Sequence, residues 1–259
     1  MPFTLAHAAA ALPFRRTRLN ASALIVGAFA PDFEYFLRLS PLGGFGHTLP
    51  GAFVLSLPLA LLVLWLFHNV VKIPLIQLLP DSIQSRVTVD PHKFSFSSLA
   101  IFALVAGSAL VGIMTHILWD SFTHPHTWPY NHWLFLRQAV QLPFGISLPG
   151  YKILQHTSTI IGTTILTVWF VLWYRATEPV IQPQVSPIPR QRKLAIIAVV
   201  LILALLGSAA RTAVAVKLSA GTHRPLESFI GKAVCTLIAL IWWQLLAYGL
   251  YLKKRTTNP

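Results

Sequence analysis

The stretch "SFSSLAIFALVAGSALVGIMTHILWDSFTHPH", residues 95–126, decides the fold and contains the first candidate site. Residues 95–119 form an apolar run that is longer than the roughly 20 residues a helix needs to cross a membrane. Four side chains that bind protons or metal ions gather where this run ends: His116, Asp120, His124 and His126. The pattern predicts a spanning helix with a metal-binding or catalytic site at one end.

The composition of the whole chain is that of an integral membrane protein. Hydrophobic residues make up 55% of the 259 residues, charged residues only 10%, and the mean hydropathy is +0.65. Soluble domains carry about 25% charged residues. The formal net charge of +13 would suit a nucleic-acid-binding protein, but the bases form short clusters between apolar runs, such as "RRTR", "RQRK" and "KKR". Such clusters are typical of cytoplasmic loops, so we expect no nucleic-acid partner.

Apolar segments along the chain predict an all-α fold, a polytopic membrane bundle of helices. Five segments approach or exceed the spanning length: 49–67, 95–119, 156–174, 194–216 and 229–252. Two shorter apolar segments precede them, at 3–14 and 20–37. A 12-residue helix rises only about 18 Å, whereas the hydrocarbon core is about 30 Å thick. We therefore expect about five full spanning helices and two shorter N-terminal helices.

The predicted domains follow from a proline-rich stretch. Residues 177–193, "TEPVIQPQVSPIPRQRK", contain four prolines and are typical of a linker, here expected in the cytoplasm. They separate a membrane-embedded block, 1–176, from a C-terminal transmembrane pair, 194–252, and a basic tail, 253–259. Cys235 is the only cysteine, which excludes a disulfide within the chain and a cysteine-rich metal site.

The distribution of Lys and Arg predicts the orientation in the membrane. If successive segments alternate in direction, the face that carries the N-terminus holds seven of the 20 basic residues: Arg38, Arg137, Lys152, Arg211, Lys217, Arg224 and Lys232. The other thirteen lie on the opposite face, which the positive-inside rule makes cytoplasmic. We therefore expect a bacterial inner-membrane protein with an extracytoplasmic N-terminus and a cytoplasmic C-terminus.

The same alternation brings most ligand-type side chains to the extracytoplasmic face. These are His7, Asp32, Glu34, His47, His116, Asp120, His124, His126, His132 and His156. His116 and Asp120 are four residues apart, so a helix places them on one face. Imidazole nitrogen and carboxylate oxygen are ligands that zinc accepts. Pro125 disfavours helix at the residue before it, so we expect His124 on the turn that leaves the membrane.

Simpler structural roles compete with this interpretation. His116 with Asp120 would also form a hydrogen-bonded pair that supports packing, and Asp32 would also cap the next helical turn. Arg211 lies inside an apolar segment, where it either reaches toward the interface or binds a phosphate or carboxylate. Ionisable groups at membrane depth are nevertheless functional by default, which favours a site.

The motifs carry a family resemblance. "MPFTLAHAAAALPFRR", "GAFAPDFEYF", "GHTLPG", "THILWDSFTHP" and "GYKILQHTSTIIG" resemble an uncharacterised bacterial membrane-protein family, a domain of unknown function whose members open with MPFTLAHPAA. The resemblance covers nearly the whole chain. It implies no particular activity.

A more distant resemblance suggests an activity. The order His7, Asp32, His47 and then His116 with Asp120 is similar to the inner-membrane proteins described as metal-dependent hydrolases, and more remotely to zinc-dependent phospholipase C. Those hydrolases have a PDxD motif and a GHRGxTHS turn. This chain has "PDFE" with Glu34 and a "GHTLPG" turn with one histidine. The resemblance implies that His124 or His156 replaces the lost ligand.

These observations predict a metal-dependent hydrolase that acts on a lipid or lipid-linked phosphoester at the extracytoplasmic face. The expected cofactor is one to three divalent ions, with zinc first and manganese or magnesium as alternatives. The expected ligands are His7, Asp32, His47, His116, Asp120 and His156. Glu34 or His124 would act as the general base, and Arg211 would bind the phosphate. The alternatives are a metal or proton transporter and a structural protein in which the metal only fastens the helices together.

Overall fold

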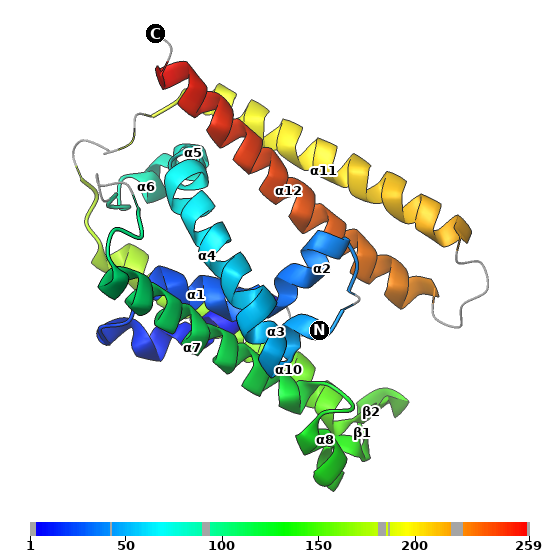
Figure 1. Ribbon diagram of the computed structural model, residues 1–259. Helices are drawn as coiled ribbons and strands as arrows, with labels where there is room; N and C mark the ends of the chain where they lie inside the picture. The colour runs from blue at the N-terminus through cyan, green and yellow to red at the C-terminus, as the bar shows by residue number, and fades with distance from the viewer. Residues whose placement is uncertain are drawn as a thin grey trace. The chain divides into compact units, whose positions relative to one another are not determined.

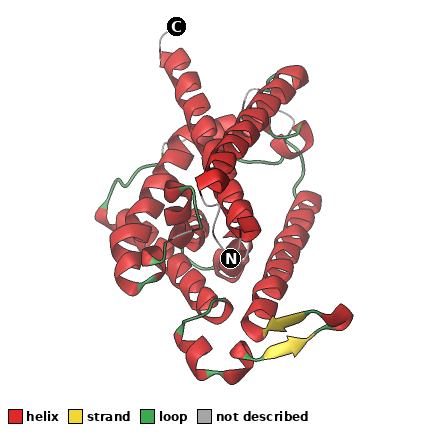
Figure 2. Cartoon of the chain, turned by 90° about the vertical axis from the view of Figure 1, so that its right-hand side faces the viewer, coloured by secondary structure: helices red, strands yellow, loops and turns green. Residues whose placement is uncertain are grey.

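A computed structural model of the chain describes residues 4–41, 43–89, 94–180, 185, 187–218 and 225–257. Figure 2 shows helices almost throughout, with one pair of short strands at the end of a long helix. The strands β1 (Ala139–Gln141) and β2 (Ser147–Pro149) pair antiparallel. The all-α prediction is confirmed.

The elements before the first long helix are short and broken. In chain order they are η1 (Thr4–Arg16), α1 (Ala21–Phe29), η2 (Ala30–Asp32), α2 (Phe33–Arg38), η3 (Phe45–His47), α3 (Leu49–Gly51), η4 (Ala52–Ser56), α4 (Leu57–Leu66), η5 (Phe67–Val71), α5 (Lys72–Leu78) and α6 (Asp81–Gln84). The long helices and the elements between them are α7 (Leu99–Thr123), α8 (Trp128–His132), α9 (Leu134–Arg137), η6 (Pro143–Gly145), α10 (Gly150–Ala176), α11 (Arg190–Leu218) and α12 (Pro225–Thr257).

Five helical stretches are long and apolar enough to cross a membrane, as the sequence predicts. They are Leu49–Leu78, Leu99–His132, Gly150–Ala176, Arg190–Val214 and Phe229–Arg255. The chain is a multi-pass membrane protein. The two shorter N-terminal segments are also helical, but η1 is a 3₁₀ helix, and the predicted helix over 20–37 divides at Pro31 into α1, η2 and α2.

The chain folds into two compact units that do not follow the predicted domain borders. The first contains residues 1–33, 45–64 and 96–173, and the second contains residues 34–44, 65–95 and 174–259. Residues 34–44 and 65–95 of the predicted N-terminal block therefore pack with the C-terminal helical pair.

Close contact between α1 and α7 organises the first unit (Figure 1). A Cβ atom on Gly27 would lie 2.2 Å from the carbonyl oxygen of Ala109, and one on Gly112 would lie 2.2 Å from that of Leu24. Only glycine permits backbones to approach this closely, which is the usual way that membrane helices pack without a hydrophobic driving force. The backbone amide of Asn20 also donates to Ser108 Oγ across 2.9 Å. These contacts fix the register of α7 against α1.

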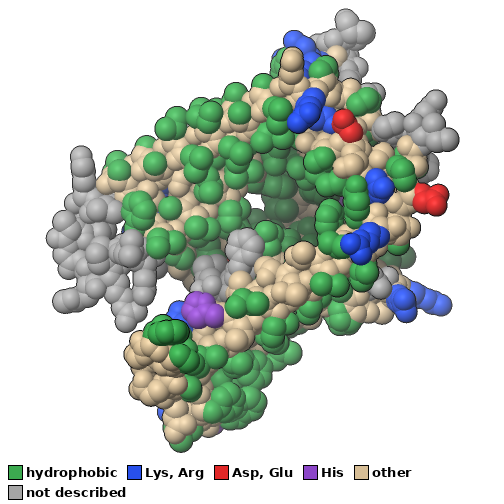
Figure 3. All heavy atoms as spheres, turned by 180° about the vertical axis from the view of Figure 1, so that it is seen from behind, with side chains coloured by type: hydrophobic (Ala, Val, Ile, Leu, Met, Phe, Trp, Pro, Cys, Tyr) green, Lys and Arg blue, Asp and Glu red, His purple; other side chains and the backbone are tan. Residues whose placement is uncertain are grey.

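The helices α11 and α12 dominate the second unit, and hydrophobic side chains cover much of their surface (Figure 3). Near its C-terminal end α12 lies against η5. A Cβ atom on Gly249 would be 2.4 Å from the carbonyl oxygen of Val70. The predicted linker 177–193 is shorter than expected, because α11 begins at Arg190. Residues 181–184 and 186 lie outside the described residues.

Candidate metal centre

The buried face of α7 carries the two residues of the HxxxD motif. Its buried residues recur every three or four positions: Val105, Ser108, Ala109, Gly112, Ile113, His116, Asp120 and Thr123. This spacing marks one face of a helix. Gly112 lets that face pack closely against α1. His116 lies one turn after Gly112 and Asp120 one turn after His116, so both side chains are directed into the first unit. The predicted common face of His116 and Asp120 is therefore present.

The backbone of α1 determines which nitrogen of His116 faces the centre. His116 is fully buried, and its Nδ1 lies 2.7 Å from the carbonyl oxygen of Ala28. A carbonyl can only accept, so Nδ1 carries the proton and donates. In the neutral ring Nε2 then has a free lone pair. A backbone carbonyl that holds one ring nitrogen while the other binds is typical of histidines that bind metal ions.

Asp32 approaches the same point from the end of η2. Pro31 ends the regular α1 helix, and the following 3₁₀ turn buries Asp32, which is 2% exposed. Thr4 of η1 donates its hydroxyl to Asp32 Oδ2 across 2.6 Å. The other carboxylate oxygen of Asp32, Oδ1, lies 3.4 Å from His47 Nε2 and 3.7 Å from His116 Nε2. Thr4 thus fixes which oxygen of Asp32 points into the centre.

The short helix η3 positions His47. A Cβ atom on Gly46 would lie 2.7 Å from the carbonyl oxygen of Pro31, so η3 packs directly on η2. Ser56 donates to the carbonyl of Gly46 across 3.0 Å and holds this turn against η4. The glycine-rich turn before His47 therefore serves close approach, as its sequence indicates. The His47 side chain is 18% exposed, which makes it the partly solvated member of the group.

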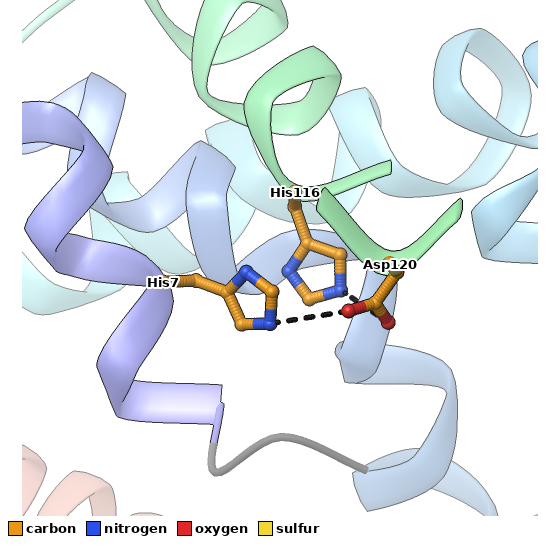
Figure 4. A group of neighbouring side chains, drawn as sticks. All are labelled: His7, His116 and Asp120. Atoms are coloured by element: carbon orange, nitrogen blue, oxygen red, sulfur yellow. Dashed lines mark ion pairs between the residues drawn. The ribbon is translucent and has the colours of Figure 1, made fainter. Parts of the chain in front are cut away.

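His7 covers the other side of His116. The two rings are stacked, with centroids 3.9 Å apart and planes inclined by 20°. Figure 4 shows His7 on η1 directed toward Asp120, with its Nε2 lying 3.4 Å from Asp120 Oδ1. The same view shows His116 and Asp120 one turn apart on α7. His7 is 6% exposed, so the imidazole is buried among ligand-type groups.

Five distances among Asp32 Oδ1, Asp120 Oδ2 and the Nε2 atoms of His47 and His116 are close to those between neighbouring ligands of a tetrahedral ion. The nitrogens are 3.2 Å apart. Asp120 Oδ2 is 3.5 Å from the nitrogen of His47 and 3.4 Å from that of His116. Asp32 Oδ1 lies 3.4 and 3.7 Å from the same two atoms. Zinc bonds of about 2.0–2.1 Å at tetrahedral angles place neighbouring ligand atoms about 3.3–3.4 Å apart. Five edges of the expected tetrahedron are therefore close to the required length.

Unpaired polar atoms also favour a cation at this point. Among the described residues, His7 Nε2 and Asp32 Oδ1 are buried and have no hydrogen-bond partner. Buried polar atoms without partners are costly in a finished fold. A divalent ion beside each of these atoms would satisfy it, because the ion accepts a lone pair and offsets the charge of the carboxylates.

Asp120 serves two groups of ligands with its two oxygens. Its Oδ2 faces His47 and His116, whereas its Oδ1 faces His7. The candidate ligand atoms accordingly form two sets, one of His7, His116 and Asp120 and one of Asp32, His47 and His116. This arrangement suits a carboxylate that bridges two ions, which are about 3.5–4 Å apart in two-metal sites.

Contacts between acidic and basic side chains shift the pKa values in the centre. Burial alone would raise the pKa of Asp32, but the contact with His47 and the charge of His116 outweigh it and hold that pKa below its ordinary value. Burial would likewise lower the pKa of His47, but Asp120 and Asp32 raise it to about 9. Without metal, His47 therefore retains a proton at neutral pH, and an ion would have to displace that proton.

His124 borders the centre on the exposed side. The helix α7 ends at Thr123, and His124 adopts an extended conformation at its C-cap, as expected before Pro125. Its Nδ1 lies 3.4 Å from Asp120 Oδ2 and 3.1 Å from the carbonyl oxygen of Asp120. The side chain is 28% exposed. His124 thus combines contact with a central carboxylate and access to solvent.

Three predicted site residues lie apart from these ligand sets. His156 is exposed on α10 and belongs to neither set. Glu34 belongs to the second unit, where its Oε1 contacts Arg38 Nε and Nη2, each at 2.9 Å. Arg211 also belongs to the second unit and contacts Thr236 and the carbonyl oxygen of Arg38.

Two contributors were not predicted. Thr4 orients Asp32, and the carbonyl of Ala28 orients His116. Thr4 lies three residues before His7, the spacing of one helical turn, and this spacing could have identified it. The carbonyl of Ala28 leaves no signal in the sequence, because any residue has one.

Comparison with known families assigns the chain to a family without giving a function. The model of the Domain of unknown function (DUF4184) matches residues 1–250. The chain belongs to the DUF4184 family. No curated protein and no solved structure matches it. Membership of DUF4184 confirms the resemblance to an uncharacterised family, but the comparisons do not support a relationship to metal-dependent hydrolases or phospholipase C. The arrangement of the candidate metal centre is therefore the evidence for any activity of this DUF4184 member.

Proposed function

We propose that the protein is a metal-dependent hydrolase that cleaves a lipid or lipid-linked phosphoester at the extracytoplasmic face of a bacterial inner membrane. The observation that carries the proposal is the convergence of ring nitrogens and carboxylate oxygens from Asp32, His47, His116 and Asp120 at 3.2–3.7 Å, with His7 as a further candidate ligand. Oxygen and nitrogen ligands without cysteine suit zinc, and also manganese or magnesium.

The surplus of ligands favours catalysis over a purely structural ion. A structural zinc is closed by four protein ligands, whereas a catalytic ion keeps a position for water or substrate. Asp32, His47, His116 and Asp120 Oδ2 would complete a closed set. His7 and Asp120 Oδ1 would then hold a second ion with few protein ligands, and that ion would have open positions. In such sites an ion lowers the pKa of water and polarises the phosphoryl group.

His124 is the better supported general base of the two candidates. Its Nδ1 lies 3.4 Å from Asp120 Oδ2, and its ring is partly exposed, so it can exchange protons with solvent. The carboxylate of Glu34 instead forms an ion pair with Arg38. Asp120 would orient the His124 imidazole, and the proton taken up by His124 would pass to the leaving group.

The depth of the centre in the chain supports a lipid-type substrate. His47 immediately precedes the span Leu49–Leu78, and His116 and Asp120 lie in the C-terminal half of the span Leu99–His132. Because α7 ends at Thr123, His116 and Asp120 lie within its last two turns, which we expect near the headgroups that carry the phosphoesters of lipids. The excess of basic residues on the opposite face supports an extracytoplasmic site. Labelling of a cysteine introduced between 121 and 155 by an impermeant reagent would test this orientation.

The decisive experiment uses the full chain in lipid nanodiscs. Protein stripped of metal is loaded with zinc, manganese or magnesium and incubated with phospholipids and lipid-linked pyrophosphates. We expect metal-dependent product release that Asp120→Asn abolishes, that His124→Gln reduces and that Glu34→Gln leaves nearly unchanged. His156→Ala is the matched control, since it removes an exposed histidine outside the ligand sets.

A transporter is the second candidate, because the buried His and Asp cluster would also bind protons or carry metal ions. A pathway needs polar groups that continue through the membrane. On α7 the buried residues before the cluster are Val105, Ser108, Ala109, Gly112 and Ile113, and none of these ionises. Absence of cleavage, together with saturable metal or proton flux that His116→Ala removes, would replace the hydrolase with a transporter. Retention of metal with neither activity would leave a structural ion.

A further inference from the structure

The second unit contains a basic corner where the end of α2 meets α11 and α12. A Cβ atom on Gly231 of α12 would lie 2.7 Å from Pro41 Cγ, so the chain after α2 packs tightly against α12. Arg211 of α11 reaches the same segment, with its Nη2 lying 3.4 Å from the carbonyl oxygen of Arg38. Three elements that are distant in sequence therefore converge on Arg38 and Arg211.

A third base belongs to this corner. Arg211 Nη1 donates to Thr236 Oγ1 across 3.3 Å, and Thr236 Oγ1 donates to the carbonyl of Lys232, one helical turn earlier. Lys232 and Thr236 lie four residues apart and hence on one face of α12. Among the described acidic side chains, the one in contact with these bases is Glu34, which pairs with Arg38. Three bases against one acid leave the corner positively charged.

The contacts of Arg211 leave much of its binding capacity unused. A guanidinium carries five N–H donors, and strong hydrogen bonds to oxygen measure about 2.7–3.2 Å. Both contacts of Arg211 are longer than this. Ser40, two residues after Arg38, is 7% exposed, and its hydroxyl has no hydrogen-bond partner among the described residues. Unfilled donors and a buried hydroxyl at one positively charged corner are features of an anion site.

The position of the corner along the spans indicates which anion reaches it. Arg211 lies seven residues before the end of α11 at Leu218, and Lys232 lies seven residues after the start of α12 at Pro225. Both bases therefore lie about two turns from the same end of the pair, on the side where the headgroups of one leaflet are expected. The opposite end carries the clusters "RQRK" and "KKR", so bases at this end are a minority that the topology does not explain.

We propose that Arg38, Arg211 and Lys232 bind the phosphate of an anionic lipid headgroup at the end of the α11–α12 pair. The planar fork of Arg211 is suited to two oxygens of one phosphate, and Lys232 supplies a compact charge beside it. Ser40 offers a hydroxyl donor to the same group. The site lies within the second unit and does not depend on the metal centre.

Native mass spectrometry of the full-length protein tests this proposal. Protein is titrated with phosphatidylglycerol, with phosphatidylcholine and with inorganic phosphate. We expect phosphatidylglycerol to bind in preference to phosphatidylcholine, and the double variant Arg211→Gln/Lys232→Gln to weaken that binding about tenfold, as for loss of a charge-assisted hydrogen bond. Lys152→Gln is the matched control, because Lys152 is a base of the same predicted face that contacts Gln155 instead.

The arms of the experiment separate the sources of phosphate. Equal binding of phosphatidylglycerol by the double variant and the wild type would overturn the proposal. Saturable binding of inorganic phosphate that the double variant loses, without preference for the lipid, would keep the phosphate site but assign a soluble ligand. Arg211→Lys keeps the charge and loses the fork, so intermediate binding would confirm the geometry even if the double variant folds poorly. The metal content of every variant should stay unchanged, which distinguishes failure here from failure of the proposed hydrolase.

Discussion

Two buried polar clusters in this protein differ in how their donors and acceptors match. In the second unit, Lys193 Nζ, on a side chain 7% exposed, donates to the carbonyl of Leu79 at 2.9 Å, to Asp81 Oδ1 at 2.5 Å and to Gln84 Oε1 at 3.0 Å. The amide of Gln84 in turn donates to the carbonyl of Val185 at 3.0 Å. The three protons of the ammonium group meet three acceptors, so this cluster needs no further component.

The cluster in the first unit has the opposite character. His7, Asp32, His47, His116 and Asp120 present ring nitrogens and carboxylate oxygens to one another at 3.2–3.7 Å. These distances exceed those of strong hydrogen bonds and match the separation of atoms that share an ion. A fully matched cluster is typical of a structural role, whereas a cluster with surplus acceptors is suited to binding a cation.

Asp120→Asn should have the largest effect, because Asp120 contacts both ligand sets. Neutralising it removes the bridging charge and places an amide donor among the ligands. We expect metal affinity to fall more than about 100-fold, beyond the 10–100-fold typical of residues that only orient ligands. Elemental analysis after equilibrium dialysis measures this. Normal metal content in this variant would remove the basis for a cation centre.

His7→Ala should remove one ion rather than both. His7 lies next to Asp120 Oδ1, whereas Asp32 and His47 belong to the other set of candidate ligands. We expect the metal content at saturation to fall from two ions per chain to one, while the tightly bound ion stays. Complete loss of metal would show that His7 belongs to a single site.

The pH should change metal affinity in a defined direction. Metal-free His47 holds its proton until the pH rises through a pKa of about 9, since Asp120 and Asp32 stabilise the charged form. That stabilisation of the metal-free fold is complete below about pH 6.5 and disappears as the pH approaches 9. Displacement of one proton predicts that zinc affinity rises about tenfold per pH unit between pH 6.5 and 8. Calorimetric titration measures this slope, and a flat profile would show that His47 does not bind.

Thr4→Val should have a smaller effect, because Thr4 orients a ligand without binding the ion. Loss of its hydrogen bond to Asp32 Oδ2 frees the carboxylate to rotate. We expect about tenfold weaker zinc binding, at the lower end of the range for orienting residues. Competition with a zinc indicator dye detects such a change. Thr127→Val, which removes a threonine outside the ligand sets, is the control.

Lys193→Met should leave metal binding unchanged and reduce stability alone. The substitution removes the ammonium donor of the Lys193 cluster and leaves buried acceptors without a partner. We expect this to cost about 1–3 kcal/mol in the free energy of unfolding. Asp81 is mostly exposed, so the charge pair itself adds little. Thermal unfolding with parallel metal analysis measures both effects. A fall in metal content would show that the two clusters are not independent.

The sequence predicted the centre well where helical spacing applies. His116 and Asp120 share the buried face of α7, and Pro125 ends that helix before His124, as expected. His7, Asp32 and His47 come from three different elements, and each lies near His116 or Asp120.

Other features depend on packing that spacing does not reveal. His156 begins an apolar segment of the sequence, much as His47 precedes one. Its position on α10 nevertheless leaves it exposed. The close contacts of Gly27 and Gly112 set the register that buries His116, and no periodicity predicts which glycines meet. Lys193 appeared to be one base of a cytoplasmic cluster, and only the packing of α6 and α11 shows that it is buried.

The metal content of the untagged protein, purified without chelator, shows whether the buried His and Asp cluster holds a cation. Elemental analysis should find at least one transition-metal ion per chain and approach two after saturation with zinc, with Asp120→Asn below one. Protein that contains no metal, takes up none from added zinc and keeps its full thermal stability would contradict the account.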